Sequence, residues 1–222
     1  IKVNNIDVNK DHTTKNYTQV AGRGQNALLP HHTSLLVQAN SSTTTSSTIA
    51  DQSGKHTLVV SGAVHSQTKT HFGNTAIWFD GTDDRLTITG SPALAVAAGE
   101  DYSLEFWIYH SSNLSTLNNQ YWWNDGNDYA FKSYRHTSAD WFMLILDSTT
   151  ILNGAFDSRP AWHHAAVARN GTTHTMWIDG QLVAANTATS GANIAIALDG
   201  TGFALGSYLG TTSVPCHGYL DQ

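Results

Sequence analysis

Apolar and polar residues alternate regularly over residues 101–109 of this sequence. Because the side chains of a strand point alternately to its two faces, one face would carry Tyr102, Leu104, Phe106 and Ile108. The other face would carry Ser103, Glu105, Trp107 and Tyr109. We predict that the first face packs against a core, whereas the mixed second face is typical of a curved sheet that is partly covered.

Residues 162–183 predict two consecutive β-hairpins. Asn170-Gly171 and Asp179-Gly180 each separate short runs of apolar or small residues. A type I′ turn needs positive φ at both central residues, and Asn, Asp and Gly tolerate that conformation best. Two hairpins so close together require antiparallel neighbours, so this segment predicts an antiparallel β architecture.

About a dozen short strands are predicted at roughly regular spacing. The others lie at residues 35–37, 58–64, 76–81, 85–88, 129–131, 141–146, 194–198 and 203–207. Residues 85–88 would return as a strand after the Asp80-Gly81 turn, and the turn-rich residues 118–128 would form a loop. No repeat of fixed period is visible, which argues against a propeller or a solenoid. The pattern predicts an all-β fold, an antiparallel two-sheet β-sandwich or jelly roll.

Residues 1–30 are polar and lack a sustained period, with Gly22, Gly24 and Pro30 as breaks. We interpret this segment as an N-terminal arm or linker, either a flexible leader or an arm that crosses to a neighbouring subunit of a homo-oligomer. Residues 31–222 are predicted to form one domain. The chain begins at Ile1 without Met and ends abruptly, so we expect it to be a piece of a longer protein.

Composition narrows the classes of function. The 222 residues carry a formal net charge of −6, and only 13% of them are charged. Sequence-independent binding of nucleic acid needs clustered Lys and Arg, so we expect no nucleic-acid partner. No run of about 18 apolar residues occurs, so we expect no membrane insertion. The single cysteine, Cys216, cannot form an internal disulfide.

Several motifs occur in a recognisable order. They are FDGTDDRLTI at residues 79–88, DYSLEFWI at 101–108, WHHAAVAR at 162–169, WIDG at 177–180, FALG at 203–206 and GYLD at 218–221. Together they resemble the laminin-G-like members of the concanavalin A-like lectin/glucanase superfamily, over about residues 31–222. The resemblance implies a concanavalin A-like jelly roll of two curved antiparallel sheets, which usually acts as a binding or adhesion module.

The phrase HFGNTAIWFDG at residues 71–81, the Leu35-Leu36 opening and the Ser/Thr-rich segment after it are most similar to copies in virion proteins of marine bacteriophages. This resemblance implies a location on a virion surface, or otherwise outside the cell. It also implies a glycan, a host-surface protein or another virion protein as the partner. The alternative is a purely structural tail or capsid-decoration subunit, whose surfaces serve assembly.

Aromatic and polar residues predicted to lie in the loop at 118–128 are the candidate ligand-binding residues. They are Tyr121, Trp122, Trp123, Asn124 and Asp125. Sugar rings present apolar CH faces that stack on Trp and Tyr, while Asn and Asp fix the hydroxyl groups, and such loops commonly carry recognition. The competing interpretation is that the tryptophans close one end of the sandwich core or form a subunit contact.

Asp80, Asp83 and Asp84 form the densest acidic segment. The resemblance implies calcium, because laminin-G-like domains often hold this ion at the rim and it prefers carboxylate and carbonyl oxygens. These three residues are therefore the candidate calcium ligands. The competing interpretation is that Asp80-Gly81 is simply a turn.

The superfamily also contains glycoside hydrolases, which cleave sugars with paired acids. Retaining hydrolysis needs two carboxyl groups about 5–5.5 Å apart across the scissile bond. Glu100, Asp101 and Glu105 are not spaced like the acids on the catalytic strand of those enzymes. We therefore predict a protein that is not an enzyme, with a divergent glycoside hydrolase as the remaining alternative.

Overall fold

The structure is a computed structural model. It describes residues 33–89, 94–97, 100–111, 119–126, 129–136, 139–157, 160–187, 202–209 and 215–221. Within these residues fourteen strands form two seven-stranded sheets in which neighbouring strands are antiparallel. The described residues contain no helix long and apolar enough to cross a membrane. The predicted all-β, antiparallel two-sheet β-sandwich is confirmed.

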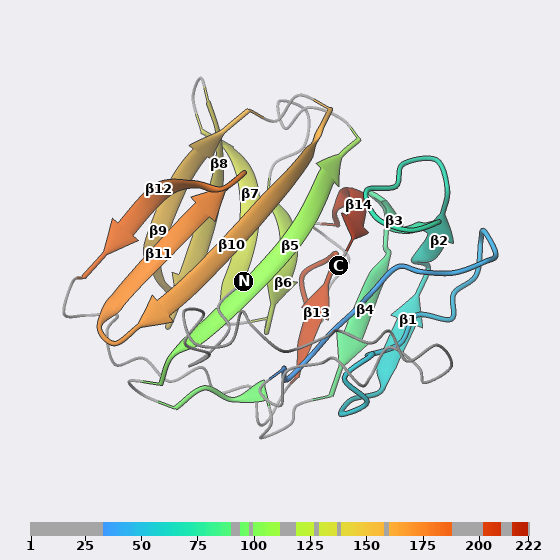
Figure 1. Ribbon diagram of the computed structural model, residues 1–222, viewed down its shortest axis with the longest axis horizontal. Helices are drawn as coiled ribbons and strands as arrows, with labels where there is room; N and C mark the ends of the chain where they lie inside the picture. Colours follow the sequence, from blue (N-terminus) through green and yellow to red (C-terminus); the bar gives the residue numbers. More distant parts are fainter. Residues whose placement is uncertain are drawn as a thin grey trace, which may run out of the picture.

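One sheet, which we call the β6 sheet, has the order β1-β4-β13-β6-β7-β8-β9. Its strands are β1 (Leu58–Ser61), β4 (Arg85–Ile88), β6 (Gln120–Asn124), β7 (Ala130–His136), β8 (Ala139–Leu146), β9 (Thr149–Phe156) and β13 (Phe203–Leu205). Strands β6 to β9 of this sheet lie behind the other sheet in Figure 1.

The second sheet, which we call the β5 sheet, has the order β12-β11-β10-β5-β14-β3-β2. Its strands are β2 (Val64–Ser66), β3 (Ala76–Asp80), β5 (Tyr102–His110), β10 (Trp162–Asn170), β11 (Thr173–Ile178), β12 (Gln181–Asn186) and β14 (His217–Asp221). Strands β5 and β10 cross the front of the molecule in Figure 1.

The core lies between the two sheets. On β5, Phe106 and Ile108 are 8% and 0% exposed, and Tyr102 and Leu104 pack at the margin of the same core. The ring of Phe106 stacks on Phe131 of β7 with centroids 5.5 Å apart. The face predicted from the alternation of residues 102–108 therefore does pack against the core, and burial of such apolar surface drives the sheets together.

The two hairpins at β10, β11 and β12 are confirmed, with one change in the first turn. Asn170 pairs with Thr173, so the two turn residues are Gly171 and Thr172. Gly171 has φ 59° and Asn170 is not in the positive-φ region, a pattern that fits type II′ and not the predicted type I′. In the second turn both Asp179 (φ 50°) and Gly180 (φ 77°) are positive, as type I′ requires.

Two expected connections are wrong because the chain changes sheet instead of turning back. After the Asp80-Gly81 turn, β4 does not pair with β3 but joins β1 and β13 in the β6 sheet. Residues 58–64 do not form one strand, since Gly62 (φ 73°) separates β1 from β2 and these belong to different sheets. Residues 35–37 contribute only one isolated bridge, from Val37 to Asp51.

The sequence pattern does not predict strand β9 (Thr149–Phe156). Its turn uses Asp147 (φ 52°) and Ser148 (φ 55°), which both adopt positive φ without a glycine to signal it. The predicted strand at residues 194–198 and the predicted arm at residues 1–30 lie outside the described residues. The domain boundary at residue 31 therefore stays a prediction.

A buried histidine sits among the aromatic residues of the core. His110, at the end of β5, is 1% exposed, and its Nε2 lies 2.9 Å from Ser133 Oγ on β7. The indole Nε1 of Trp122 donates to the same hydroxyl oxygen at 2.9 Å. Burial lowers the pKa of His110 to about 3, and the nearby His163 contributes to this shift. His110 is therefore neutral in the folded protein near pH 7.

We expect acid to destabilise the fold through His110. An unfolded histidine has its ordinary pKa of 6.5, so below that pH the unfolded state binds a proton that the folded state excludes. Stability from this group is complete above pH 6.5 and falls as the pH drops toward 3, by about 2 kcal/mol between pH 7 and pH 5. Urea unfolding at both pH values should show this loss shrinking by that amount in His110→Phe, with the exposed His71→Gln as control. An unchanged pH dependence in His110→Phe would contradict the assignment.

Candidate functional site

The candidate ligand-binding residues Tyr121 to Asp125 lie mostly in strand β6, and not in a loop as expected. A register shift between Tyr121 and Trp123 marks a β-bulge, which breaks the alternation of faces along the strand. As a result Trp122 (0% exposed) and Trp123 (5%) both belong to the core. The competing interpretation, that these tryptophans close the sandwich, describes the structure.

Asn124 and Asp125 are also buried, and their polar atoms hold backbone segments together. The Asn124 amide donates to Ser207 O at 2.6 Å, and its Oδ1 accepts from the backbone nitrogens of Gly126 and Leu209. Asp125 Oδ1 accepts from the backbone nitrogen of Tyr129 at 3.0 Å. These bonds position the chain after β6 and after β13. A ligand-binding role for the four buried residues stays a prediction that their burial does not favour.

Tyr121 is the one member of the set that faces outward from the β6 sheet. The strand register places it in a row across β6, β7, β8 and β9, which reads Tyr121, Lys132, Met143 and Asn153. The next row places Tyr134 beside Trp141. Side chains in register on neighbouring strands share a face and stand side by side. We call Tyr121, Lys132, Tyr134, Trp141 and Met143, which are all half-buried, the tyrosine–lysine surface.

Lys132 lies between aromatic rings of this surface. Its Nζ is 5.3 Å from the ring centroid of Tyr121 and 5.7 Å from that of Tyr134, both within cation–π range. Tyr208 meets Tyr121 edge-on with centroids 5.0 Å apart, and its hydroxyl donates to the carbonyl of Gly126. Partial burial lowers the pKa of Lys132 and raises the pKa of Tyr121. The surface combines apolar rings, hydroxyl groups and one cation.

The outer face of the β5 sheet is also aromatic, but a loop of the same chain covers part of it. The imidazole of His71 stacks on the indole of Trp107, with centroids 3.8 Å apart and planes 28° apart. Asp221 holds this loop, because its Oδ2 accepts from the backbone nitrogens of His71 and Phe72 at 3.1 and 2.8 Å. Trp107 therefore packs chiefly against the loop of the same chain that carries His71 and Phe72.

Glu105, one of the acids considered for hydrolysis, lies on the same outer face. Its Oε2 is 3.4 Å from Nε2 of His164 on the adjacent strand β10. This contact lowers the pKa of Glu105 despite partial burial. A carboxyl group that is held in its ionised form lacks the proton that the acid of a glycosidase must donate.

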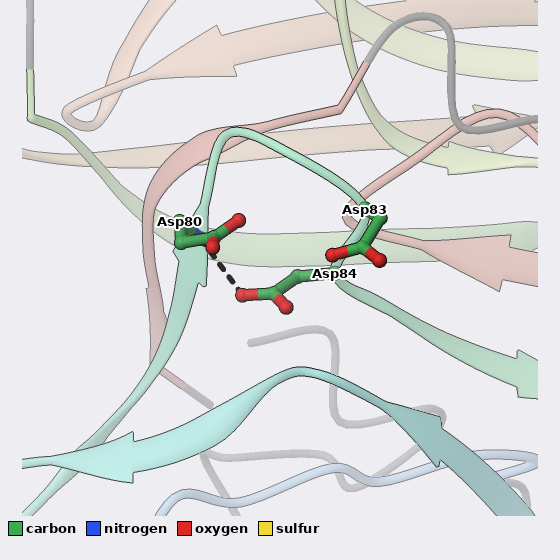
Figure 2. Close-up of side chains that lie close together, drawn as sticks. All are labelled: Asp80, Asp83 and Asp84. Carbon is green, nitrogen blue, oxygen red and sulfur yellow. Dashed lines mark hydrogen bonds between the residues drawn. The ribbon is translucent and has the colours of Figure 1, made fainter.

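Asp80, Asp83 and Asp84 do come together, as the sequence suggested. Their nearest carboxylate oxygens all lie within 4.8 Å of one another. Figure 2 shows them around the turn that carries the chain from β3 to β4, with Asp84 hydrogen-bonded to the backbone nitrogen of Asp80 at 2.8 Å. The turn interpretation therefore also holds, because Asp84 Oδ2 closes this turn.

The three carboxyl groups differ in environment. Asp80 and Asp83 are exposed, whereas Asp84 is 4% exposed. Burial raises the pKa of Asp84, although the bond from the Asp80 backbone lowers it, and the charges of Asp80 and Asp83 raise it further. Gly62 makes room for this carboxylate, since a Cβ there would lie 1.8 Å from Asp84 Oδ1. The cluster offers hard oxygen donors of the kind that fit calcium.

Residues 80–222, more than half of the chain, match the Laminin_G_3 family, described as concanavalin A-like lectin/glucanases superfamily. The chain belongs to this family. The resemblance to laminin-G-like domains is thus confirmed, whereas the resemblance to virion proteins of bacteriophages is not. A search of curated proteins found none that matches this laminin-G-like domain.

Solved structures share the fold of this laminin-G-like domain. Domain 4 of AbnA, a GH43 extracellular arabinanase from Geobacillus stearothermophilus, in complex with arabinotriose, is 14% identical with a TM-score of 0.53, over 78% of this chain and 83% of that one. The binding domain of botulinum neurotoxin DC in complex with SialylT is 14% identical with a TM-score of 0.58, over 84% of this chain and 46% of that one.

The enzymatically active domain of tailspike protein 2 from bacteriophage CBA120 is a further structure of this fold. It is 13% identical with a TM-score of 0.53, over 74% of this chain and 27% of that one. The laminin-G-like domain thus spans under half of the toxin and tailspike chains. At these identities the likeness establishes the fold alone.

Proposed function

We propose that this laminin-G-like domain binds carbohydrate without cleaving it, through the tyrosine–lysine surface. The observation that carries the proposal is the outward row of rings on β6, β7 and β8, with Tyr121, Tyr134 and Trp141 around a single lysine. Aromatic rings supply apolar stacking area, and tyrosine adds a hydroxyl group that can bind a ligand. A few polar groups among apolar ones are the usual composition of a small-ligand site.

The rigidity of the scaffold favours the same function. The three rings stand on neighbouring strands of one sheet, so their separations are fixed by the sheet and not by loops. Tyr134 and Trp141 are directly opposite each other, and Tyr121 lies diagonally from Tyr134, a separation of about 7–8 Å between Cα atoms. A ligand that stacks on these rings meets a preorganised surface, which limits the entropy lost on binding.

The carbohydrate ligands named with two structures of this fold add support. Domain 4 of AbnA is in complex with arabinotriose, and the botulinum neurotoxin domain is in complex with SialylT. The acids of the domain support binding without cleavage. Glu105 is paired with His164 on the other sheet, and Asp84 is buried beneath its turn. The described side chains that face outward from β6 to β9 include no carboxylate.

Substitutions on the tyrosine–lysine surface should weaken binding to a glycan array. We expect Tyr134→Ala and Trp141→Ala each to reduce the affinity for the bound glycans by about 10-fold, since each removes a stacking interaction worth about 1.4 kcal/mol of binding free energy. Trp177→Ala is the matched control, because Trp177 is 39% exposed on the outer face of the other sheet. An equal loss of glycan affinity in Trp177→Ala, or unchanged affinity in both Tyr134→Ala and Trp141→Ala, would contradict a binding site on the tyrosine–lysine surface.

We further propose that Asp80, Asp83 and Asp84 hold a calcium ion at the rim of the sandwich. The support is the convergence of their oxygens within 4.8 Å and the preference of calcium for carboxylate ligands. A bound cation would stabilise the turn between β3 and β4 by offsetting the repulsion among the three charges.

Calcium should therefore raise the melting temperature of the domain relative to a chelator. A concentration 100 times the dissociation constant stabilises by about 2.7 kcal/mol, which is a shift of several degrees. The exposed Asp83→Asn should abolish most of the shift, while Asp147→Asn, in the turn before β9, should preserve it. Magnesium serves as a second control. A melting temperature that does not respond to calcium would remove the ion from the proposal.

The finer placement that we propose is the surface of a phage virion, as part of a tail or capsid-decoration protein. The motif similarity of residues 71–81 and the fold shared with a phage tailspike support it. A second candidate function is assembly, favoured by Trp177 and Leu182, which pair across β11 and β12 and are 39% and 52% exposed.

Mass spectrometry of purified virions should detect peptides of this chain if the virion placement holds. Solution mass measured by light scattering then separates the two functions. A glycan-binding monomer favours adhesion, whereas an oligomer that Trp177→Ala dissociates, and that binds no glycan, favours assembly. Peptides found only in the host fraction would contradict the placement.

A further inference from the structure

We infer that the glycan bound by the tyrosine–lysine surface is acidic, and that Lys132 holds its carboxylate or sulfate group. This inference rests on the proposed function and narrows it to a class of ligand. Its basis is the position of one cation among rings, on a face whose described side chains include no acid.

Lys132 lacks an anionic partner within the described part of the chain. Its Nζ contacts only the rings of Tyr121 and Tyr134 among the interactions that the structure contains for it. The residues directly beside it in the sheet are Tyr121 on β6 and Met143 on β8, which carry no charge. A surface lysine usually extends into water, but this one is half-buried between its neighbours.

The charge distribution among the described outward side chains of β6 to β9 also supports an acidic ligand. Among the described side chains that face outward from β6 to β9, Lys132 is the only charged one. The protein as a whole has a formal net charge of −6. A cation with no acidic partner among the described side chains of its face, on an acidic protein, gives a local attraction for an anion.

An anionic group of a ligand would stabilise the partly buried ammonium group of Lys132. Partial burial lowers the pKa of Lys132, because the ammonium group loses water there. A carboxylate or sulfate beside Nζ would replace it with a charge-assisted hydrogen bond, which is stronger than a neutral one. The rings on both sides would stack on the sugar that carries this charge.

The ring geometry favours a glycan over a bare polyanion. Tyr121, Tyr134 and Trp141 present apolar area around a single positive charge, whereas a polyphosphate ligand needs several cations along its backbone. A polyanion would also be repelled by the net charge of −6. The ligand that fits is an oligosaccharide with one or a few acidic groups.

Calorimetric titration of the full chain with matched oligosaccharides tests the inference. One pair is tetragalacturonic acid and its methyl ester, and the other is a sulfated carrageenan tetrasaccharide and a neutral agarose tetrasaccharide. We expect the charged member of at least one pair to bind about 10-fold tighter or more, the gain of a charge-assisted contact. Raising the salt concentration should weaken only the charged ligand.

Three variants locate the effect. Lys132→Gln should remove the preference for the charged member of each pair. Lys132→Arg should retain this preference within about 3-fold, because lysine and arginine both carry a positive charge that can pair with an acidic group. Lys69→Gln is the matched control, since Lys69 Nζ also lies 5.3 Å from a tyrosine ring, that of Tyr109 on the other sheet. It should bind as the wild-type chain does. Melting temperatures of all variants check that the fold is retained.

The outcomes separate the two proposals. Charged and neutral members that behave alike in both pairs, or Lys132→Gln that keeps the preference, would overturn the acidic-glycan inference. Binding of neutral glycans that is lost in Tyr134→Ala would leave the proposed function standing without it. A single-stranded oligonucleotide that binds as tightly as the acidic oligosaccharide would also overturn the inference, because the surface would then select for negative charge alone.

Discussion

A ladder of phenylalanine rings lines the core side of the β6 sheet and contacts the β5 sheet through Phe106, and the rest of the structure depends on this packing. Phe106 of β5 stacks on Phe131 of β7, Phe131 on Phe142 of β8, and Phe142 on Phe156 of β9, with centroids 5.5, 5.3 and 4.0 Å apart. These contacts occupy the core face of each strand, so they also decide which side chains point outward. Lys132 and Tyr134 face solvent because Phe131 and Ser133 face the core.

The bulge in β6 modifies this constraint at one position, and the composition of the outer surface follows from it. Without the extra residue, Tyr121 and Trp123 would share a face and Trp122 would lie on the opposite one, so only one of the two tryptophans could enter the core. With it, both tryptophans enter the core, where Trp122 bonds to Ser133 beside His110. Tyr121 is left outside next to Lys132. The buried polar cluster and the tyrosine–lysine surface are thus two consequences of one irregular register.

Local patterns predicted part of the fold and little of the site. The alternation of residues 102–108 and the Gly-marked hairpin of β11 and β12 were readable because both depend on neighbours in sequence. Strand β9 was missed because Asp147 and Ser148 supply positive φ without glycine. The change of sheet after Asp80 could not be read from its turn, because an Asp-Gly pair permits reversal and crossover alike. The sequence predicts Tyr121 as a ligand-binding residue, but its partners on β7 depend on a pairing register that a single strand does not encode.

The two outer faces show how similar composition leads to different roles. Both carry aromatic side chains in register across strands, and each has a lysine over a tyrosine ring. On the β5 sheet, Asp221 fixes a loop about 150 residues away in sequence, and His71 from that loop occupies the face of Trp107. Stacking capacity there is used within the chain. On the β6 sheet, Lys132 instead lies over the rings of both Tyr121 and Tyr134. We therefore place the candidate site on the face where a lysine lies between two tyrosine rings, and not on the face where a loop of the same chain stacks on Trp107.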